Sequence, residues 1–290
     1  MLRSRFIVDS GTQLCCLIGD PVAQSPSPGM HNSTFRSAGL NFIYLSFRVP
    51  AAELEAAVNG LRAIGVRGFN VTIPHKEAVT KLVDTLDSIS SDLGAVNTVV
   101  NDGGELFGVN TDIEGFITPL KDKEIPLMHR RSMILGAGGA ARACIAGLVH
   151  EGCTEFVILN RTNERASRMV SDFKQKFDFE AEVAPLNEEN IARSIGSVDL
   201  VVNATPIGMY PNVSESPIPK DLLREEQVIY DIVYKPVKTK LIEYAETVGA
   251  TVIHGYEMLV SQAAGSFSLW TGVEAHKGVM RRTVLQLLGV

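Results

Sequence analysis

A glycine-rich segment between a predicted strand and a predicted helix constrains the fold of this chain more than any other feature. The strand is Arg131-Ser-Met-Ile-Leu135, the segment is Gly136-Ala-Gly-Gly-Ala-Ala141, and the helical pattern continues to Val149. The first glycine permits a tight turn, the next two let the backbone approach a pyrophosphate, and the last alanine allows close packing of helix on sheet. The helix N-terminus then favours an anion. We expect a dinucleotide-binding sheet, although an ordinary βα turn can carry the same glycines.

The rest of the chain repeats this alternation of strands and helices. Short apolar runs predict strands at residues 14–18, 44–49, 68–72, 95–100, 106–109, 156–159, 200–202, 228–232 and 251–253. Amphipathic runs predict helices at residues 51–64, 164–174, 239–248, 256–270 and 275–288, and a further helix with Ser27 as its N-cap and Pro28 as its first residue. Such alternation predicts an α/β fold with a parallel, doubly wound sheet. A length of 290 residues favours two domains.

Composition excludes several classes of protein. A net charge of -6 argues against general affinity for nucleic acid or for an anionic membrane. No apolar run reaches the roughly 18 residues that a membrane span needs, so we expect a cytoplasmic protein. The four cysteines have no metal-binding spacing and the six histidines are dispersed, which predicts reduced thiols and no metal site.

The end of the strand after the glycine segment indicates which dinucleotide is bound. An NAD site would carry Asp or Glu about 20 residues beyond the glycines, where it would bind the ribose hydroxyls. This chain instead has Asn160-Arg-Thr-Asn-Glu-Arg165. The guanidinium groups of Arg161 and Arg165 suit a 2′-phosphate, and Glu164 belongs to the first turn of the next helix. The sequence therefore favours NADP.

Polar side chains gather where other predicted strands end. The segments are Asn70-Val-Thr-Ile-Pro-His-Lys76, Asn97, and Asn110-Thr-Asp112. In an open α/β sheet, small polar ligands bind at this edge. A lysine with a carboxylate returned to the same edge can act as a proton donor and its positioning partner. Together with a dinucleotide, this set predicts reduction of a small polyhydroxylated carbonyl compound.

The order and spacing of these blocks resemble one family from about residue 14 to residue 272. The chain is similar to the shikimate dehydrogenases, including the quinate/shikimate dehydrogenases. Besides the segments above, the resemblance rests on Ile18-Gly-Asp-Pro-Val22, Ser25-Pro-Ser-Pro28, His31-Asn32, Gly94-Ala-Val-Asn-Thr98, Gly115-Phe116, Asn203-Ala-Thr-Pro-Ile-Gly-Met209, Asp231-Ile-Val-Tyr234, Gly255, Met258 and Gln262. Two departures are Gln24, where the family usually has histidine, and Pro26, where a larger apolar residue is common.

The resemblance implies a domain organisation and a set of site residues. Residues 1–112 and 256–290 would form an N-terminal α/β substrate domain rejoined by C-terminal helices, and residues 113–255 an inserted Rossmann domain for NADP. The catalytic pair would be Lys76 and Asp112. Substrate would be bound by Ser25, Ser27, Thr72, Asn97, Tyr234 and Gln262. The cofactor would be bound by Gly136, Ala137, Gly138, Gly139, Ala140, Asn160, Arg161, Thr162, Arg165, Thr205, Ile232 and Gly255.

The implied activity is the reversible, NADPH-dependent reduction of 3-dehydroshikimate to shikimate, a step toward the aromatic amino acids, with no metal. Three alternatives stay open: a related enzyme that acts on quinate, alone or besides shikimate, or on an amino-substituted analogue; a non-catalytic NADP-binding sensor that kept the fold; and a generic Rossmann reductase. The expected partner is a small-molecule substrate. The sequence leaves open whether the chain is a monomer or a homodimer.

Overall fold

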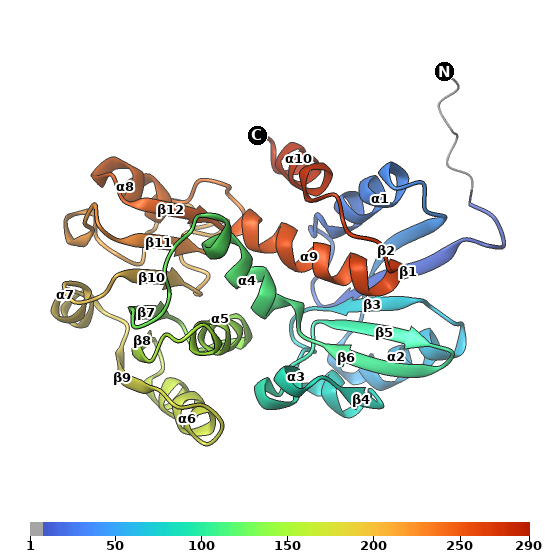
Figure 1. Cartoon of the computed structure of the whole chain (residues 1–290), viewed down its shortest axis with the longest axis horizontal. Helices are drawn as coiled ribbons and strands as arrows, with labels where there is room; N and C mark the ends of the chain where they lie inside the picture. The colour runs from blue at the N-terminus through green and yellow to red at the C-terminus, as the bar shows by residue number, and fades with distance from the viewer. Residues whose placement is uncertain (1–7) are drawn as a thin grey trace. The chain divides into compact units, whose positions relative to one another are not determined.

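The computed structural model describes residues 8–290, which divide into two compact units (Figure 1). One unit, here called the split unit, combines the chain up to Thr111 with Gln262–Val290. The other, the inserted unit, is Asp112–Ser261. The boundaries expected from sequence were after residues 112 and 255. In the structure they fall after Thr111 and after Ser261, the second inside the helix α9 (Gly255–Thr271).

The split unit is built on a mixed sheet with the strand order β2-β1-β3-β5-β6-β4. Strand β1 is parallel to both β2 and β3, whereas β5 runs antiparallel to its two neighbours β3 and β6. The register pairs Asn70 with Thr98 and Gly68 with Val100, so the start of β5 lies beside the end of β3. The strands are β1 (Gln13–Gly19), β2 (Phe42–Arg48), β3 (Gly68–Val71), β4 (Thr85–Leu86), β5 (Thr98–Asp102) and β6 (Glu105–Val109).

Helices cover this sheet with apolar side chains. In α2, Leu54, Val58 and Leu61 are spaced for one helical face and pack into a core with Ile18 and Phe69 of the sheet. Trp270 ties α9 to the sheet, because its Nε1 donates to the Val99 carbonyl at 3.0 Å. The helices of the split unit are α1 (Ser27–Ser37), α2 (Leu54–Ala63), α3 (Ser88–Leu93), most of α9, and α10 (Lys277–Leu288), with 3₁₀ turns at Ala51–Glu53 and Ala78–Lys81.

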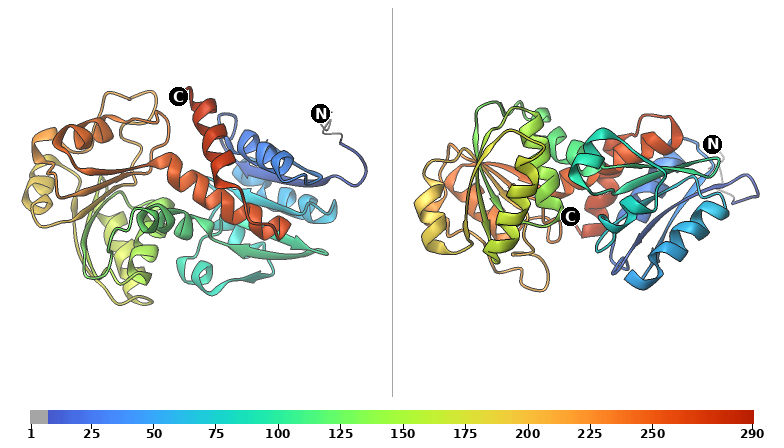
Figure 2. Two further views of the ribbon diagram at one scale, coloured as in Figure 1. Left: turned by 45° about the horizontal axis from the view of Figure 1, so that its top comes forward. Right: turned by 90° about the horizontal axis from the view of Figure 1, so that it is seen from below.

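The inserted unit has a parallel sheet with the strand order β12-β11-β10-β7-β8-β9. The chain order reverses between β7 and β10, which is the switch point where such sheets bind ligands. Helices cover both faces (Figure 2), and on one face Met133 and Leu135 pack with Ile191 and Leu241. The strands are β7 (Arg131–Leu135), β8 (Glu155–Asn160), β9 (Glu180–Pro185), β10 (Leu200–Asn203), β11 (Val228–Asp231) and β12 (Thr251–His254). The helices are α4 (Thr111–Asp122), α5 (Gly139–His150), α6 (Asn163–Lys174), α7 (Glu188–Ile195) and α8 (Lys240–Val248), with a 3₁₀ turn at Lys220–Leu222.

One helix start differs from the sequence-based prediction. Pro26 is the N-cap of α1 and Ser27 is its first residue, with no side-chain cap. The helix α4 begins at Thr111, so Asp112 lies in its first turn. By contrast, Thr239 caps α8 by accepting from the Ile242 N–H, and Gly249 ends that helix with φ +85°. All four cysteines are buried free thiols. Within residues 8–290, no helix combines the length and apolarity that a membrane crossing requires.

Candidate active site

In the split unit, the carboxyl ends of β1 and β3 lie side by side and carry the first polar residues. The Thr72 N–H donates to the Ile18 carbonyl at 2.9 Å. Gly19 is required by this approach, because a Cβ there would lie 2.3 Å from Cγ2 of Thr72. Thr72 is therefore presented at the sheet edge beside the loop that leaves β1.

Lys76 follows β3 in a turn that is held by buried contacts on both sides. The ring of His75, 1% exposed, hydrogen-bonds through Nε2 to the Val49 carbonyl at 2.7 Å. The Lys76 carbonyl accepts from the Val96 N–H at 2.8 Å, which places Lys76 beside the segment that carries Asn97. The Lys76 side chain is half-buried. The backbone of a candidate proton donor is thus fixed at the edge where Asn97 lies.

Ser25 and Ser27 form one pair of hydroxyls in the loop after β1. Oγ of Ser25 donates to Oγ of Ser27 at 3.1 Å, and the Ser27 N–H donates back to the Ser25 hydroxyl at 3.3 Å. Pro26 between them is buried as the N-cap of α1. The two hydroxyls therefore lie together at the start of a helix, where a carboxylate is favoured.

Asn97 is buried, 3% exposed, directly before β5. Its Oδ1 accepts from the Thr111 N–H at 2.7 Å, and its Nδ2 donates to the Thr111 hydroxyl at 3.0 Å. Asn97 is thereby joined to the residue that precedes Asp112 in the chain. Asp112 is buried in the first turn of α4, and Gln262 is half-buried on α9.

Two further asparagines from the sequence motifs have structural partners. Asn110 donates from Nδ2 to the Ala95 carbonyl at 3.0 Å. Asn70 accepts on Oδ1 from the Tyr44 hydroxyl at 2.7 Å and donates from Nδ2 to the Asn97 carbonyl at 3.1 Å. Both residues support the backbone that carries the candidate site.

In the inserted unit, the glycine segment lies at the switch point between β7 and β10. Gly136 has φ +110°, and a Cβ on it would lie 2.7 Å from the Ala204 carbonyl oxygen, so a side chain cannot be accommodated. A Cβ on Gly138 or Gly139 would meet nothing within 4 Å, so space is open beside the loop. The helix α5 begins at Gly139 without a side-chain cap. Uncapped N–H groups beside open space fit a pyrophosphate.

The segment after β8 presents positive charge. Asn160 is half-buried and donates from Nδ2 to the Thr162 carbonyl at 2.8 Å, which shapes the turn. Arg161 and Arg165 are exposed, and neither forms an ion pair with another described residue. Glu164 is in the first turn of α6. The arrangement fits a phosphate on the ribose that would lie at this strand end.

Thr205 is held after β10 by two buried residues that were not selected from the sequence. Asn203 Oδ1 accepts from the Thr205 hydroxyl at 2.6 Å and from its N–H at 3.1 Å. Nδ2 of Asn203 donates to Oδ1 of Asp231 at 3.0 Å. Burial raises the pKa of Asp231 to about 6, against the effect of hydrogen bonds from Thr239, Val233 and Asn203. Only strand pairing brings Asn203 and Asp231 together, although both residues lie inside sequence segments that resemble the family.

The remaining residues of the inserted unit lie at the ends of β11 and β12. A Cβ on Gly255 would lie 2.5 Å from the carbonyl oxygens of Ile232 and Val233, so only glycine lets α9 start there. Tyr234 is half-buried, and burial raises the pKa of its hydroxyl, which therefore stays a neutral donor. These residues share one unit with the glycine segment.

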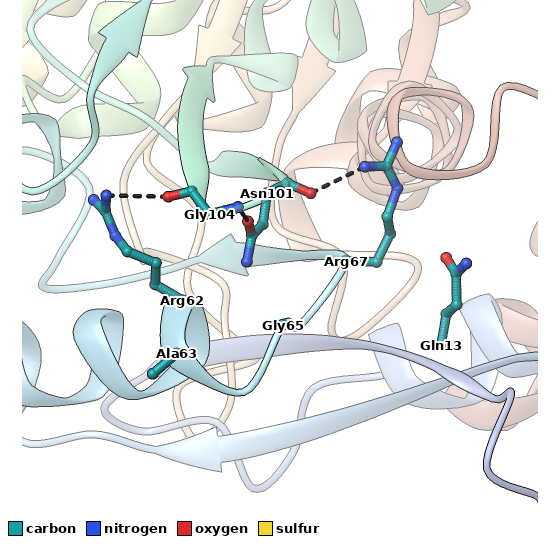
Figure 3. Close-up of a pocket in the computed structure, with 8 residues that line it drawn as sticks. Gln13, Arg62, Ala63, Gly65, Arg67, Asn101 and Gly104 are labelled. Carbon is teal, nitrogen blue, oxygen red and sulfur yellow. Dashed lines mark hydrogen bonds between the residues drawn. The ribbon is translucent and has the colours of Figure 1, made fainter.

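A hollow of about 510 Å³ lies at the other end of the split unit's sheet (Figure 3). Its lining is Gln13, Arg62, Ala63, Gly65, Arg67, Asn101, Gly103 and Gly104. Arg62 donates to the Asp84 carboxylate at 2.9 Å and to the Gly104 carbonyl at 3.2 Å, and Arg67 donates to the Asn101 carbonyl at 3.0 Å. The arginines thus brace the hairpin between β5 and β6. None of the predicted site residues lines this hollow.

Comparisons with known proteins agree with the motifs. Three family models match: the shikimate dehydrogenase substrate binding domain at residues 17–99, shikimate / quinate 5-dehydrogenase at residues 120–232, and the shikimate 5′-dehydrogenase C-terminal domain at residues 255–285. Shikimate dehydrogenase (NADP(+)) of Methanopyrus kandleri is 47% identical over 283 residues, covering 97% of this chain and 98% of that protein.

Two solved structures share the fold over nearly the whole chain. Shikimate 5-dehydrogenase from Listeria monocytogenes, in complex with shikimate and NAD, has a TM-score of 0.89 and 36% identity and covers 95% of this chain and 97% of its own. The enzyme from Thermus thermophilus, in complex with NADP(H) and shikimate, has a TM-score of 0.85 and 35% identity, with coverages of 95% and 100%.

Proposed function

The chain belongs to the shikimate dehydrogenase family, and from that premise we propose that it reduces 3-dehydroshikimate to shikimate with NADPH, reversibly. It is an NADP-dependent oxidoreductase of aromatic amino-acid biosynthesis. The observation that carries the proposal is that the chain has two separate sites, one suited to the dinucleotide and one suited to a small polar substrate. An uncapped helix start with open glycines lies in one unit, and the segments of Lys76, Thr72 and Asn97 share one sheet edge in the other.

Lys76 is the proposed proton donor of this reaction. A nicotinamide cofactor held by the glycine segment at the start of α5 would supply the hydride for the ring carbonyl carbon. As the carbon–oxygen π bond breaks, the oxygen takes a proton from the Lys76 ammonium, which becomes neutral and is reprotonated by solvent. In the oxidation direction, neutral Lys76 accepts the hydroxyl proton. Asp112 accepts a hydrogen bond from the reacting hydroxyl and orients it.

The other polar residues bind and orient the substrate. Ser25 and Ser27 donate to the ring carboxylate from the start of α1. Thr72, Asn97 and Gln262 bind the ring hydroxyls, and the neutral Tyr234 hydroxyl adds a further donor. Several directed hydrogen bonds hold a small ring in one orientation, and such positioning lowers the barrier to reaction.

Arg161 and Arg165 give the preference for NADP. Their guanidinium groups suit the 2′-phosphate, and no carboxylate of the described chain pairs with them. The partners in this proposal are a small-molecule substrate and at most a second copy of the chain. The net charge of -6 gives no attraction to nucleic acid or anionic membranes, and we place the enzyme in the cytoplasm.

A steady-state panel tests the proposal. Shikimate and quinate are each oxidised with NADP and with NAD, and kcat/KM is measured for the four pairs. We expect the highest value for shikimate with NADP. No turnover of shikimate with either cofactor would refute the activity and favour the non-catalytic sensor. Equal values for shikimate and quinate would favour the second candidate, an enzyme of dual specificity, which the shikimate / quinate family model also describes.

A further inference from the structure

Three buried hydroxyl groups from three separate segments of the split unit lie within hydrogen-bond distance of one another. They belong to Thr98 at the start of β5, Thr111 at the start of α4, and Ser266 on α9, and are here called the hydroxyl cluster. The Oγ1 of Thr98 is 2.8 Å from Oγ of Ser266 and 3.1 Å from Oγ1 of Thr111, and the Thr111 and Ser266 hydroxyl oxygens are 3.2 Å apart. All three side chains are 0–6% exposed.

The cluster determines the orientation of the Asn97 side chain. A backbone N–H can only donate, so the atom 2.7 Å from the Thr111 nitrogen must be Oδ1 of Asn97. The Thr98 hydroxyl donates to the same oxygen at 3.0 Å. With Oδ1 assigned by these donors, the other terminal atom of the amide is Nδ2, which donates to the Thr111 hydroxyl at 3.0 Å. The Asn97 amide is therefore held in one of its two possible orientations.

Asn70 and the α9 backbone complete the set of partners. Nδ2 of Asn70 donates to Thr98 Oγ1 and to Ser266 Oγ, both at 3.0 Å. Because the Thr98 proton goes to Asn97, the Ser266 hydroxyl is the donor to Thr98 Oγ1 at 2.8 Å, and the Gln262 carbonyl, one turn earlier on α9, lies 3.2 Å from Ser266 Oγ. A buried polar network with its members paired fixes one arrangement of the segments that carry it.

Each segment in the cluster also carries a residue of the proposed substrate site. Asn97 precedes Thr98, Asp112 follows Thr111, and Gln262 lies one turn before Ser266. We propose that Thr98 and Ser266 are positioning residues of the reaction, because their hydroxyls hold Asn97, Thr111 and the Gln262 turn of α9 in the arrangement that binds shikimate. They do not touch the substrate and act through the residues beside them.

This inference rests on the proposed function, and it predicts a specific kinetic signature. A misplacement of substrate-binding groups by about 1 Å costs roughly 100-fold in rate. Thr98→Val keeps the shape of the side chain and removes only the hydroxyl. We expect it to lower kcat/KM for shikimate by about 10- to 100-fold, with a raised KM for shikimate, while the KM for NADP stays within about twofold.

Matched variants separate positioning from a structural role. Thr98→Ser restores the hydroxyl without the methyl group and should recover most of the activity. Ser266→Ala should lower kcat/KM in the same way. The double variant of Thr98→Val and Ser266→Ala should lower kcat/KM by a smaller factor than the product of the two single-variant factors, because both hydroxyls belong to one network. Ser90→Ala is the control, since Ser90 is equally buried in the split unit and its hydroxyl makes no hydrogen bond.

Steady-state kinetics and thermal unfolding of all variants, with calorimetric titration of shikimate, test the inference. Thr98→Val with wild-type kcat/KM and wild-type shikimate affinity would overturn it. So would a loss that Thr98→Ser does not rescue, or an equal rise in the KM for NADP. A wild-type enzyme that does not turn over shikimate would refute the proposed function instead. In that case, equal shikimate affinity of wild type and Thr98→Val would still overturn the positioning role.

Discussion

Replacing Asp231 by asparagine should change how the stability of the inserted unit depends on pH. Asp231 is the last residue of β11 and is 0% exposed. Its carboxylate accepts from Thr239 Oγ1 at 2.6 Å, and from Asn203 Nδ2 and the Val233 N–H at 3.0 Å each. Burial nevertheless raises its pKa from 3.8 to about 6, because these three hydrogen bonds do not offset the loss of water around the charge.

The size and the sign of the effect on the free energy of unfolding follow from the difference in the pKa of Asp231 between the native and unfolded states. Between about pH 4 and pH 6 the native state binds more protons at Asp231 than the unfolded chain does, so stability falls as the pH rises. The stabilisation that the raised pKa of Asp231 gives to the native state is fully present below about pH 4 and is lost as the pH rises through about 6. A shift of about 2 pH units corresponds to about 3 kcal/mol. Asp231→Asn removes this titration while keeping an oxygen that can accept hydrogen bonds.

Urea unfolding of both proteins at several pH values from 4 to 7.5, followed by far-ultraviolet circular dichroism, measures the effect. Circular dichroism is preferred to tryptophan fluorescence because Trp270, the single tryptophan, lies in the split unit. The free energy of unfolding of Asp231→Asn, relative to wild type, should increase by about 3 kcal/mol between pH 4 and pH 7. Asp221→Asn, which removes an exposed carboxylate of the same unit, is the control. A constant difference between Asp231→Asn and wild type, or one that shrinks with rising pH, would refute the argument.

Three further predictions concern the reaction. Lys76→Ala should lower turnover by roughly two to four orders of magnitude with a smaller change in substrate affinity, and near-normal steady-state turnover would contradict its role as proton donor. Replacing Arg161 and Arg165 together by alanine should weaken NADP binding by roughly 10- to 100-fold in a fluorescence titration and leave NAD binding nearly unchanged, because NAD lacks the 2′-phosphate; an equal loss for both cofactors would exclude the assignment. Shikimate should exceed quinate in kcat/KM by roughly 10- to 100-fold, because Ser25 and Ser27 would face the carbon where quinate carries an extra hydroxyl that is left unpaired. Equal specificity constants for the two acids would show that the serine loop accepts both.

Local sequence patterns were sufficient for most elements of the inserted unit. Buried parallel strands read as continuous apolar runs, and β7, β8, β10, β11 and β12 all lie where such runs predicted strands. The strand β9 was missed, because it is an edge strand of the sequence Glu-Ala-Glu-Val-Ala-Pro and is only partly buried. The helix α7 that follows it was missed as well, because it is short and presents only two large apolar side chains to the core, Ile191 and Ile195.

The residues of the candidate site likewise include some that local sequence identifies and some that it does not. Gly136 could be selected from sequence, because a glycine between a strand and a helix reports a backbone requirement that is local, and the structure gives it a φ of +110°. The roles of Lys76 and Asp112 came from motif spacing, and they stay predictions. Ser266 could not be selected, because a serine inside an apolar helix gives no local signal.

The sequence by itself determined the α/β class, the position of the glycine turn and the polar blocks at strand ends, since each depends on residues that are neighbours in the chain. Only the tertiary structure decided the strand orders and the buried pairings, such as Asn203 with Asp231, which lie 28 residues apart, and Thr98 with Ser266, 168 residues apart. The physical reason is that a buried polar side chain is stable only with a partner, and that partner is supplied by strand pairing and helix packing between distant segments.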